Sequence, residues 1–534
     1  MKSLARFVAV FAAAVLLSVP AFAQNTSDNA TKIKELEQKL AALTAAQATP
    51  ATVPAETPAD KAVPAPAGQA GQTPTDVEKR IKELEARIAE LEKQQAAQPA
   101  LTLMNNQEIE RITPPVDLNS FFDNGYLVFT SKNGDFKYWL DGRVMLDAAS
   151  YQGAENRLPS GVEVRRARIG LKTTLYQNWL AEVDFDFADA KVSIKDLWMG
   201  YTGFGKSLIR AGNFKSPFGL DNLISSKHIM FIERSYIDAL VPDRRLGVGY
   251  SQWGNNWQVS GGVFTQEAGL FNDKDTLTGG GAGTDLPLNY VGRFTVAPLN
   301  KPRRVVHLGI AGAYRQPDVA KLATSGADLP DRESAARIVK LDSRAETHVS
   351  RAKFLSTGDM KYVDHFTQYD VEFLAILGSL TVQSEYMSTS VTRRPTAVAT
   401  FSDHDFSGYY VQAGFFLTGD SRSYWASEGE YGRVLPRRKV GAVEATIRYN
   451  TMDLDDATTV DPILGGGAKN TTFGLNWYFN ANNRLMFNVV NVNNNANARP
   501  GKDWAPIPPG TGTTLTPIYG DDFTTIAVRF QIAF

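Results

Sequence analysis

The chain has 534 residues, no cysteine, and 56 basic against 57 acidic residues, which gives a formal net charge of −1. Without cysteine the protein has no disulfide and no thiolate metal ligand, which suits a chain that crosses an oxidising compartment. The balanced charge gives no indication of a nucleic-acid partner, and we expect none.

The N-terminal residues have the pattern of a secretory signal peptide. Two basic residues, Lys2 and Arg6, precede an apolar run over 7–19, and a small-x-small tripeptide follows at 21–23. We therefore predict that residues 1–23 are removed. The alternative is an uncleaved membrane anchor, although the apolar run is short for a hydrocarbon core about 30 Å thick. No later apolar run is long enough for a spanning helix, which argues against a helical membrane protein.

Residues 24–118 are predicted to form a periplasmic coiled-coil arm of two short α-helices joined by a Pro/Ala-rich linker. The heptad positions are Ile33, Leu36, Leu40 and Leu43 in the first helix, and Val77, Ile81, Leu84, Ile88 and Leu91 in the second. The linker, 47–75, has a composition that cannot bury a core. Because a helix of two heptads is marginal alone in water, we expect several chains to associate. The alternative is a solvated helix that contacts only its own chain.

From about residue 136 apolar residues recur at every second position, which is the periodicity of β-strands. The stretches with this pattern lie at 137–147, 166–175, 182–187, 195–201, 207–214, 245–250, 256–264, 289–297, 304–314, 348–355, 367–377, 379–388, 407–418, 439–449, 470–478, 484–492 and 523–534. The stretch at 348–355 is the least regular of them. Because bacterial barrels close with an even number of strands, we predict an all-β domain over 119–534, a 16-stranded antiparallel transmembrane β-barrel.

Alternation alone does not separate a soluble β-protein, with an apolar core, from a transmembrane barrel, with an apolar face toward lipid. Three further features favour the barrel. The terminal Phe534 resembles the signal that outer-membrane proteins present to the barrel assembly machinery, the strands have about 9 to 12 residues, and long connections alternate with tight turns such as Gly378-Ser379. We therefore expect a barrel in the outer membrane, with lipid outside and water within.

The middle of the chain carries a set of basic, glycine-containing motifs. They are VRRARIG at 164–170, KDLW at 195–198, GNFKSPFGL at 212–220, SSK at 225–227 and FIER at 231–234. Together these motifs resemble the phosphate-selective porins of the O and P family. The resemblance implies a homotrimer of 16-stranded barrels, in which inward-folded loops and inward-pointing Arg and Lys side chains guide small anions, such as phosphate or polyphosphate, to a constriction.

One strand carries the first group of candidate pore-lining residues. Arg166, Arg168 and Lys172 share one parity, so they point to one side of the strand and offer successive sites for an oxyanion in a wet lumen. The alternative is a structural network in which they pair with the acidic residues at 182–186. Arg165 has the opposite parity and is predicted to mark a bulge or the rim.

The stretch 215–245 is too polar and irregular for a lipid-facing strand, and we predict a loop that narrows the pore. The alternative is a cap that does not contact the permeant ion. With Arg143 on an earlier strand, its basic residues complete the candidate set: Lys215, Lys227, Arg234, Arg244 and Arg245.

No catalytic, cofactor or metal-binding residue is predicted. The five histidines are scattered without ligand spacing, and His348 and Ser350, although of one parity, have no Asn or Asp beside them to form a hydrolase triad. We predict a passive, anion-preferring pore. Two alternatives stay open: a weakly selective general porin, because acidic residues balance basic ones in the barrel, and a structural barrel that tethers the outer membrane to the cell wall through the arm.

Overall fold

The computed structural model describes residues 118–268, 287–317, 337–395, 400–457, 460–501 and 516–534, together with Lys82, Glu83, Ala86, Arg87 and Ala89. The chain divides into two units, Met1–Pro115 and Val116–Phe534. In the first unit these five residues are helical, and they lie within the range 77–91 for which a helix is expected. The signal peptide, the linker and the heptad side chains lie outside the described residues. No helix among the described residues is long and apolar enough to cross a membrane.

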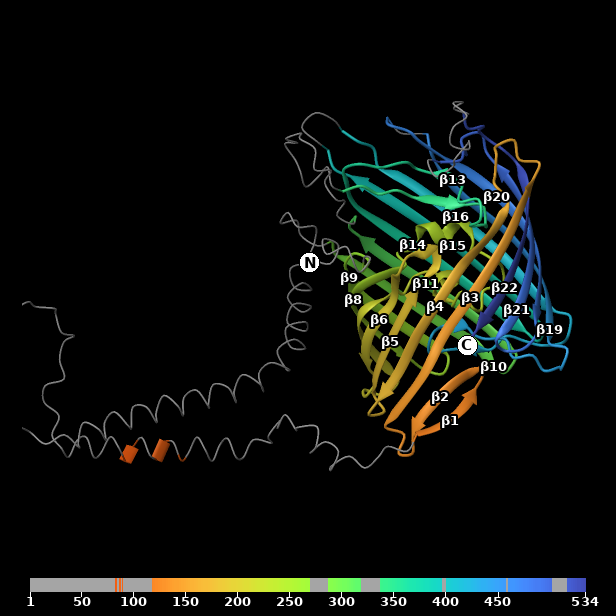
Figure 1. Cartoon of the computed structure of the whole chain (residues 1–534). Coiled ribbons are helices and arrows are strands. Elements are labelled where there is room, and N and C mark those ends of the chain that lie inside the picture. The colour runs from red at the N-terminus through yellow and green to blue at the C-terminus, as the bar shows by residue number, and fades with distance from the viewer. Residues whose placement is uncertain are drawn as a thin grey trace, which may run out of the picture. The chain divides into compact units, whose positions relative to one another are not determined.

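A closed antiparallel barrel of sixteen strands makes up most of the second unit, as the sequence predicted (Figure 1). The strands are β3 (Phe136–Gln152), β4 (Gly161–Leu175), β5 (Trp179–Asp186), β6 (Ser193–Tyr201), β7 (Ser207–Lys215), β8 (Arg244–Trp253), β9 (Trp257–Phe264), β10 (Asn289–Lys301), β11 (Arg304–Arg315), β14 (Val363–Leu377), β15 (Leu380–Arg393), β16 (His404–Phe416), β19 (Ala442–Asp456), β20 (Ile463–Tyr478), β21 (Asn483–Asn494) and β22 (Phe523–Ala533). The last strand pairs with the first, from Thr524 opposite Gln152 to Ala533 opposite Arg143, and this pairing closes the ring.

A hairpin that the sequence analysis missed precedes the barrel. It consists of β1 (Leu118–Asp123) and β2 (Tyr126–Ser131), and β2 pairs with β3. Its turn is Asn124-Gly125, where φ is 51° and 86°. Asn and Gly tolerate positive φ, and this dipeptide is a strong hairpin signal, so the turn itself was visible in the sequence.

The strands bury polar residues and expose apolar ones, which is the reverse of a soluble β-protein. On β3, Leu140, Val144 and Leu146 are exposed on the outer face, whereas Asp141 and Arg143 are buried on the inner face. Such an apolar outer face suits contact with lipid. The closed ring suits a membrane as well, because it leaves no unpaired strand edge in an apolar medium.

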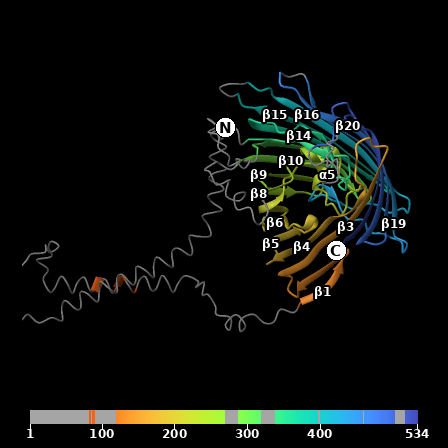
Figure 2. The same ribbon diagram turned by 45° about the horizontal axis from the view of Figure 1, so that its top comes forward.

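Within the described part of the chain, three connections fold back over or into the barrel. The lumen loop, 216–243, contains α5 (Leu220–Leu223) and η2 (Tyr236–Leu240), and Figure 2 shows α5 within the ring of strands. The rim loop, 337–362, contains β12 (Asp342–Arg344) and β13 (Lys353–Ser356), and the turn-side hairpin, 417–441, contains β17 (Tyr424–Trp425) and β18 (Glu430–Tyr431). A short helix, η1 (Ala188–Ala190), lies between β5 and β6.

The strand expected at 348–355 is not part of the barrel. Only Lys353–Ser356 is extended, and it pairs with β12 inside the rim loop. The alternation of 348–355 reflects packing of this loop, because the alternate residues Ala352 and Phe354 are buried in a core within the barrel. The expectation of 16 strands holds because this stretch is excluded.

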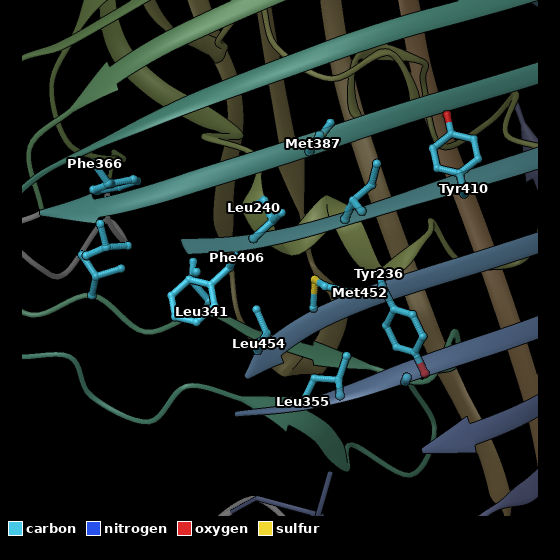
Figure 3. Close-up of a cluster of buried hydrophobic side chains, with 14 of the residues drawn as sticks. Tyr236, Leu240, Leu341, Leu355, Phe366, Met387, Phe406, Tyr410, Met452 and Leu454 are labelled. Atoms are coloured by element: carbon cyan, nitrogen blue, oxygen red, sulfur yellow. The ribbon is translucent and has the colours of Figure 1, made fainter. Parts of the chain in front are cut away.

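An apolar core inside the barrel holds the lumen loop against one side of the wall (Figure 3). Tyr236 and Leu240 from the lumen loop and Leu355 from the rim loop pack against strand residues such as Met387 and Met452. Burying a large apolar side chain contributes about 1.5–3 kcal/mol, so several of them fix the loop to the wall.

Candidate pore constriction

Asparagine side chains of the wall bind the backbone of the lumen loop. The backbone N–H of Ile232 donates to Asn488 Oδ1 at 3.1 Å, and that of Tyr236 donates to Asn450 Oδ1 at 3.1 Å. The Tyr236 hydroxyl donates to Asn470 Oδ1 at 3.1 Å. A loop buried in a barrel needs such partners, because each unpaired backbone group would destabilise it. The contacts place the loop on the side of β19, β20 and β21.

Carbonyl groups of the same loop accept hydrogen bonds from wall side chains. Arg484 donates to the Ile229 carbonyl at 2.8 Å, and Asn476 donates to the Met230 carbonyl at 2.8 Å. These contacts hold the loop against this side of the lumen. We call β10, β11, β14–β16 and β19–β22 the packed wall, and β3–β9 the open wall.

The turn-side hairpin enters the lumen from the opposite end of the barrel. It follows β16 at the end where β14 and β15 turn, since the Phe416 N–H donates to the Ser379 carbonyl at 3.0 Å. Arg422 anchors it through two hydrogen bonds to Glu444, at 2.7 and 2.8 Å, and donates to the His228 carbonyl of the lumen loop at 3.0 Å. The two insertions therefore meet inside the barrel.

A cavity of about 560 Å³ remains between these insertions and the open wall. Nine of its lining residues are Lys or Arg: Arg143, Arg166, Arg168, Lys172, Arg210, Lys215, Lys227, Arg234 and Arg244. Five are acidic: Asp141, Glu182, Asp196, Glu428 and Glu430. Among the described residues, the cavity lining thus carries an excess of positive charge that the balanced composition of the chain conceals.

The three basic residues of β4 differ in how they are paired. Arg168 Nε lies 2.8 Å from Asp186, and Lys172 Nζ lies 3.0 Å from Glu182, so the structural network considered for these two exists. Arg166 has no such neighbour: its closest carboxylate oxygen, from Glu233, is 4.0 Å away, and its Nε has no hydrogen-bond partner.

Lys215 and Arg234 are held by backbone carbonyls. The Lys215 ammonium donates to the Leu223 carbonyl at 3.1 Å, and Arg234 donates to the Asp221 and Ile224 carbonyls at 2.7 and 2.8 Å. These carbonyls belong to α5 and its end, where cations interact favourably with the unpaired C=O groups. The positive charges therefore fix the shape of the lumen loop and still line the cavity.

The remaining cations connect the loop to the open wall. Arg143 donates to Ser226 at 3.0 Å, and Lys227 lies 2.5 Å from Asp141. Burial lowers the pKa of Lys227, while the Asp141 carboxylate acts in the opposite direction. Arg244 pairs with Asp196 at 2.7 Å.

Comparison with known proteins gives a consistent family assignment. The model of the family "Phosphate-selective porin O and P" matches residues 139–516. The chain belongs to this family. Porin O of Pseudomonas aeruginosa is 26% identical over 67% of this chain and 83% of that protein. An uncharacterized protein of Caulobacter vibrioides is 26% identical over 62% of this chain and 64% of that protein.

Solved porin structures show a more distant likeness. The anion-selective porin from Comamonas acidovorans aligns over 75% of this chain and 100% of its own, with 13% identity and a TM-score of 0.43. In-vitro folded OmpT of Vibrio cholerae aligns over 75% of this chain and 98% of its own, with 10% identity and a TM-score of 0.44. By family the protein is an outer-membrane porin, that is, a channel.

The porin brings together eight of the nine basic residues that were selected from sequence. The exception is Arg245, which does not line the cavity and donates to the Pro242 and Thr265 carbonyls at 3.1 and 3.3 Å. Arg165 marks a bulge, as predicted, because Met145 pairs with Arg166 whereas the next residue of β3 pairs with Val164.

Sequence reasoning missed several lining residues of the porin. Arg210, on β7, lies over the rings of Trp198 and Phe214 at 5.5 and 4.7 Å. Its parity, shared with the lining residue Leu208, was visible in the sequence. Glu428 and Glu430 were missed because nothing local indicates that the turn-side hairpin enters the barrel.

Proposed function

We propose that this porin conducts small solutes passively and prefers anions such as phosphate, with the cavity as its constriction. The observation that supports this most strongly is the excess of Lys and Arg over acids in the cavity lining. Arg166 and Arg210 contribute most to this anion preference. Among the described residues the closest carboxylate to either guanidinium is that of Glu233, which lies 4.0 Å from Arg166. A positive charge without a close counter-ion attracts anions across a narrow lumen.

The reversal potential in a salt gradient tests this proposal. Purified porin is inserted into a planar bilayer with different KCl concentrations on the two sides, and the potential at zero current is measured. We expect the sign of the reversal potential to show that chloride permeates more readily than potassium. We also expect added phosphate to reduce the chloride current. A reversal potential near zero, or one that reports potassium preference, contradicts the proposal.

A weakly selective general porin is the second candidate. Glu428 and Glu430 favour it, because the turn-side hairpin places two carboxylates in the same cavity as the cations. In that case the porin conducts both ions, and phosphate leaves the chloride current unchanged. The same bilayer measurement therefore separates the two candidates.

We further propose that the porin is a homotrimer whose arm lies in the periplasm. The heptads at 33–43 and 77–91 support this, because they provide an apolar seam that the same helices of other chains would cover. Deleting residues 24–110 should lower the temperature at which the oligomer dissociates in detergent gels and leave the barrel folded. A protein that is monomeric before and after the deletion contradicts it.

A structural role for the arm, as a tether to the cell wall, would not require an open pore. The bilayer experiment distinguishes this role, because a barrel that only anchors the membrane passes no current. Binding of the purified porin to isolated cell wall, lost after the same deletion, would support a tether.

We propose that Phe534 serves recognition by the barrel assembly machinery. Its N–H donates to the Gly142 carbonyl at 3.0 Å, and a Cβ atom at residue 142 would lie 2.4 Å from its ring, so the terminal aromatic covers the outer seam of the closed ring. Deleting Phe534 should reduce the folded, heat-modifiable fraction in the outer membrane. An equal folded yield would identify it as an ordinary lipid-facing residue.

A further inference from the structure

Three acidic side chains of the packed wall lie together beneath the lumen loop. Asp370 and Glu372 are on β14 and Glu385 is on β15, and Glu372 is the direct cross-strand partner of Glu385. Each is 1% exposed, and oxygen atoms of the three carboxyl groups lie within 4.8 Å of one another. Like charges directly opposite on neighbouring strands repel, so this arrangement needs a compensating charge.

The known neighbours compensate only part of this charge. Arg293 donates to both oxygens of Glu372 at 2.7 Å, and His307 lies 3.2 Å from the same carboxylate. Glu385 accepts hydrogen bonds from the Tyr410 hydroxyl and from the backbone N–H groups of the first residues of α5. These donors to Glu385 are neutral. Among the described residues around the three acids, Arg293 is the permanently charged ion-pair partner, and His307 carries a charge only when its ring is protonated.

Asp370 is the group that points to a ligand. Neither of its carboxylate oxygens has a hydrogen-bond partner, although the side chain is fully buried. A carboxylate in this position is strongly unfavourable unless a proton or a cation binds it. Its Oδ atoms belong to the same group of oxygens as those of Glu372 and Glu385, so one ion placed among them would contact all three residues.

We propose that Asp370, Glu372 and Glu385 bind one hard divalent cation of the Ca²⁺ type. Three carboxylates without sulfur or nitrogen ligands favour such a cation over the softer transition metals. The oxygen separations suit it, because Ca²⁺ lies about 2.3–2.6 Å from each ligand and two ligands are therefore up to about 5 Å apart. Two positive charges together with Arg293 balance the three acids.

The ion would stabilise the lumen loop in its place. Glu385 receives the N–H groups of Leu220 and Asp221, so a cation that fixes this carboxylate also fixes the start of α5 on the wall. Loss of the ion should loosen the lumen loop without unfolding the barrel. This role does not depend on which solute the pore conducts.

The experiment measures bound metal in the full-length porin, extracted from outer membranes and passed through metal-free detergent buffer. Elemental analysis should find about one divalent ion per chain beyond the number in Asp370→Asn, which keeps the shape of the side chain and removes its charge. Asp359→Asn is the matched control, since Asp359 is an exposed acid of the rim loop. Lipopolysaccharide that copurifies with its own cations is common to all three proteins and cancels in the difference.

A calcium titration gives the second readout. After treatment with a chelator, CaCl₂ should raise the unfolding temperature of the wild type and of Asp359→Asn, and Asp370→Asn should need more than ~10-fold more calcium for the same rise. If Asp370→Asn does not fold, Glu385→Gln replaces it. Equal metal content in all folded variants, with no calcium-dependent stabilisation of the wild type, overturns the proposal and assigns the cluster to a proton shared between carboxyl groups.

Discussion

The packed and open walls of the barrel use the same residue types for different purposes. On the packed wall, Arg293 and Arg422 make two-point contacts with Glu372 and Glu444 at 2.7 to 2.8 Å, and all four side chains are buried from water. On the open wall the separations are similar but water reaches some pairs, as at Lys172 and Glu182, which lie 3.0 Å apart with side chains that are 30% and 15% exposed. Among the described residues, no carboxylate oxygen lies closer than 4.0 Å to Arg166. Charge on the packed wall therefore supports the architecture, whereas charge on the open wall is available to act on a solute.

This difference follows from the solvent that each wall faces. Removing one member of a buried ion pair leaves the other charge without water or partner, which costs about 3–5 kcal/mol. Where water reaches the pair, the remaining charge is hydrated, and a typical exposed pair contributes only about 0–1 kcal/mol. The following substitutions test this contrast, from the largest expected effect to the smallest.

The largest effect is expected from Glu444→Ala on the packed wall. The replacement leaves Arg422 unpaired and removes the acceptor of Asn476 and Tyr478, so the free energy of unfolding should fall by about 3–5 kcal/mol. Urea unfolding, followed by tryptophan fluorescence, measures the change. Glu182→Ala on the open wall is the control and should cost about 1 kcal/mol or less. Equal losses for the two variants would mean that the walls do not differ in solvation.

The second effect is a loss of anion preference on the open wall. A unit charge about 5 Å from the ion path in water changes the energy of a monovalent ion by about 0.8 kcal/mol, which is a factor of about four. Its removal acts on anions and cations in opposite directions, so the anion-to-cation permeability ratio should fall roughly 16-fold before salt screening. Arg166→Ala should shift the reversal potential most, because no carboxylate oxygen of the described residues lies closer than 4.0 Å to its guanidinium, and Arg168→Ala should follow, because it leaves Asp186 without its partner. Lys215→Ala should shift it least, since it leaves only carbonyls behind.

The control for these replacements is Lys206→Ala, which removes an exposed charge from the turn between β6 and β7. Its reversal potential should equal that of the wild type. If all four variants gave the wild-type potential and conductance, the cations of the open wall would lie outside the ion path, and the proposed constriction would lose its support.

The open wall was more accessible to sequence reasoning than the packed wall. Period-two alternation and the final Phe534 were sufficient for a barrel, and parity on one strand selected Arg166, Arg168 and Lys172, because both signals are local. The contact of Arg422 with Glu444 joins a turn-side insertion to a strand beyond it, and no local pattern encodes that insertion. For the same reason the rim loop was mistaken for a strand: burial of alternate residues in an interior core imitates a half-buried β-strand.

A third and smaller effect concerns Glu430, which the turn-side hairpin places in the cavity opposite the open wall. Limited access to water and the nearby Glu428 raise the pKa of Glu430 to about 8. Below that pH the carboxyl is neutral, and above it the carboxylate offsets one positive charge of the lining. Anion preference should therefore be greater at about pH 6 than at about pH 10. In Glu430→Gln the part of the pH dependence centred near 8 should disappear. A wild-type preference that rises with pH would contradict the assignment.

The smallest effect is expected from Arg245, which is adjacent in sequence to Arg244 but differs from it in position. Arg244 lines the cavity and pairs with Asp196, so Arg244→Gln removes a charge from the lining and leaves a carboxylate uncompensated. Arg245 donates to backbone carbonyls away from the cavity. Arg245→Gln should therefore leave the reversal potential unchanged, although the loss of a buried charge lowers stability.

Both variants should be measured in the same salt gradient and the same detergent. They carry the same substitution at adjacent positions, so a difference in reversal potential reports the position of the lost charge. A shift for Arg244→Gln of about the size expected for Arg166→Ala, with none for Arg245→Gln, places the boundary of the conducting space between two neighbouring residues. Equal shifts would mean that the long-range field of the barrel, and not the lining of the cavity, sets the selectivity. In that case the distinction between the two walls would concern stability alone.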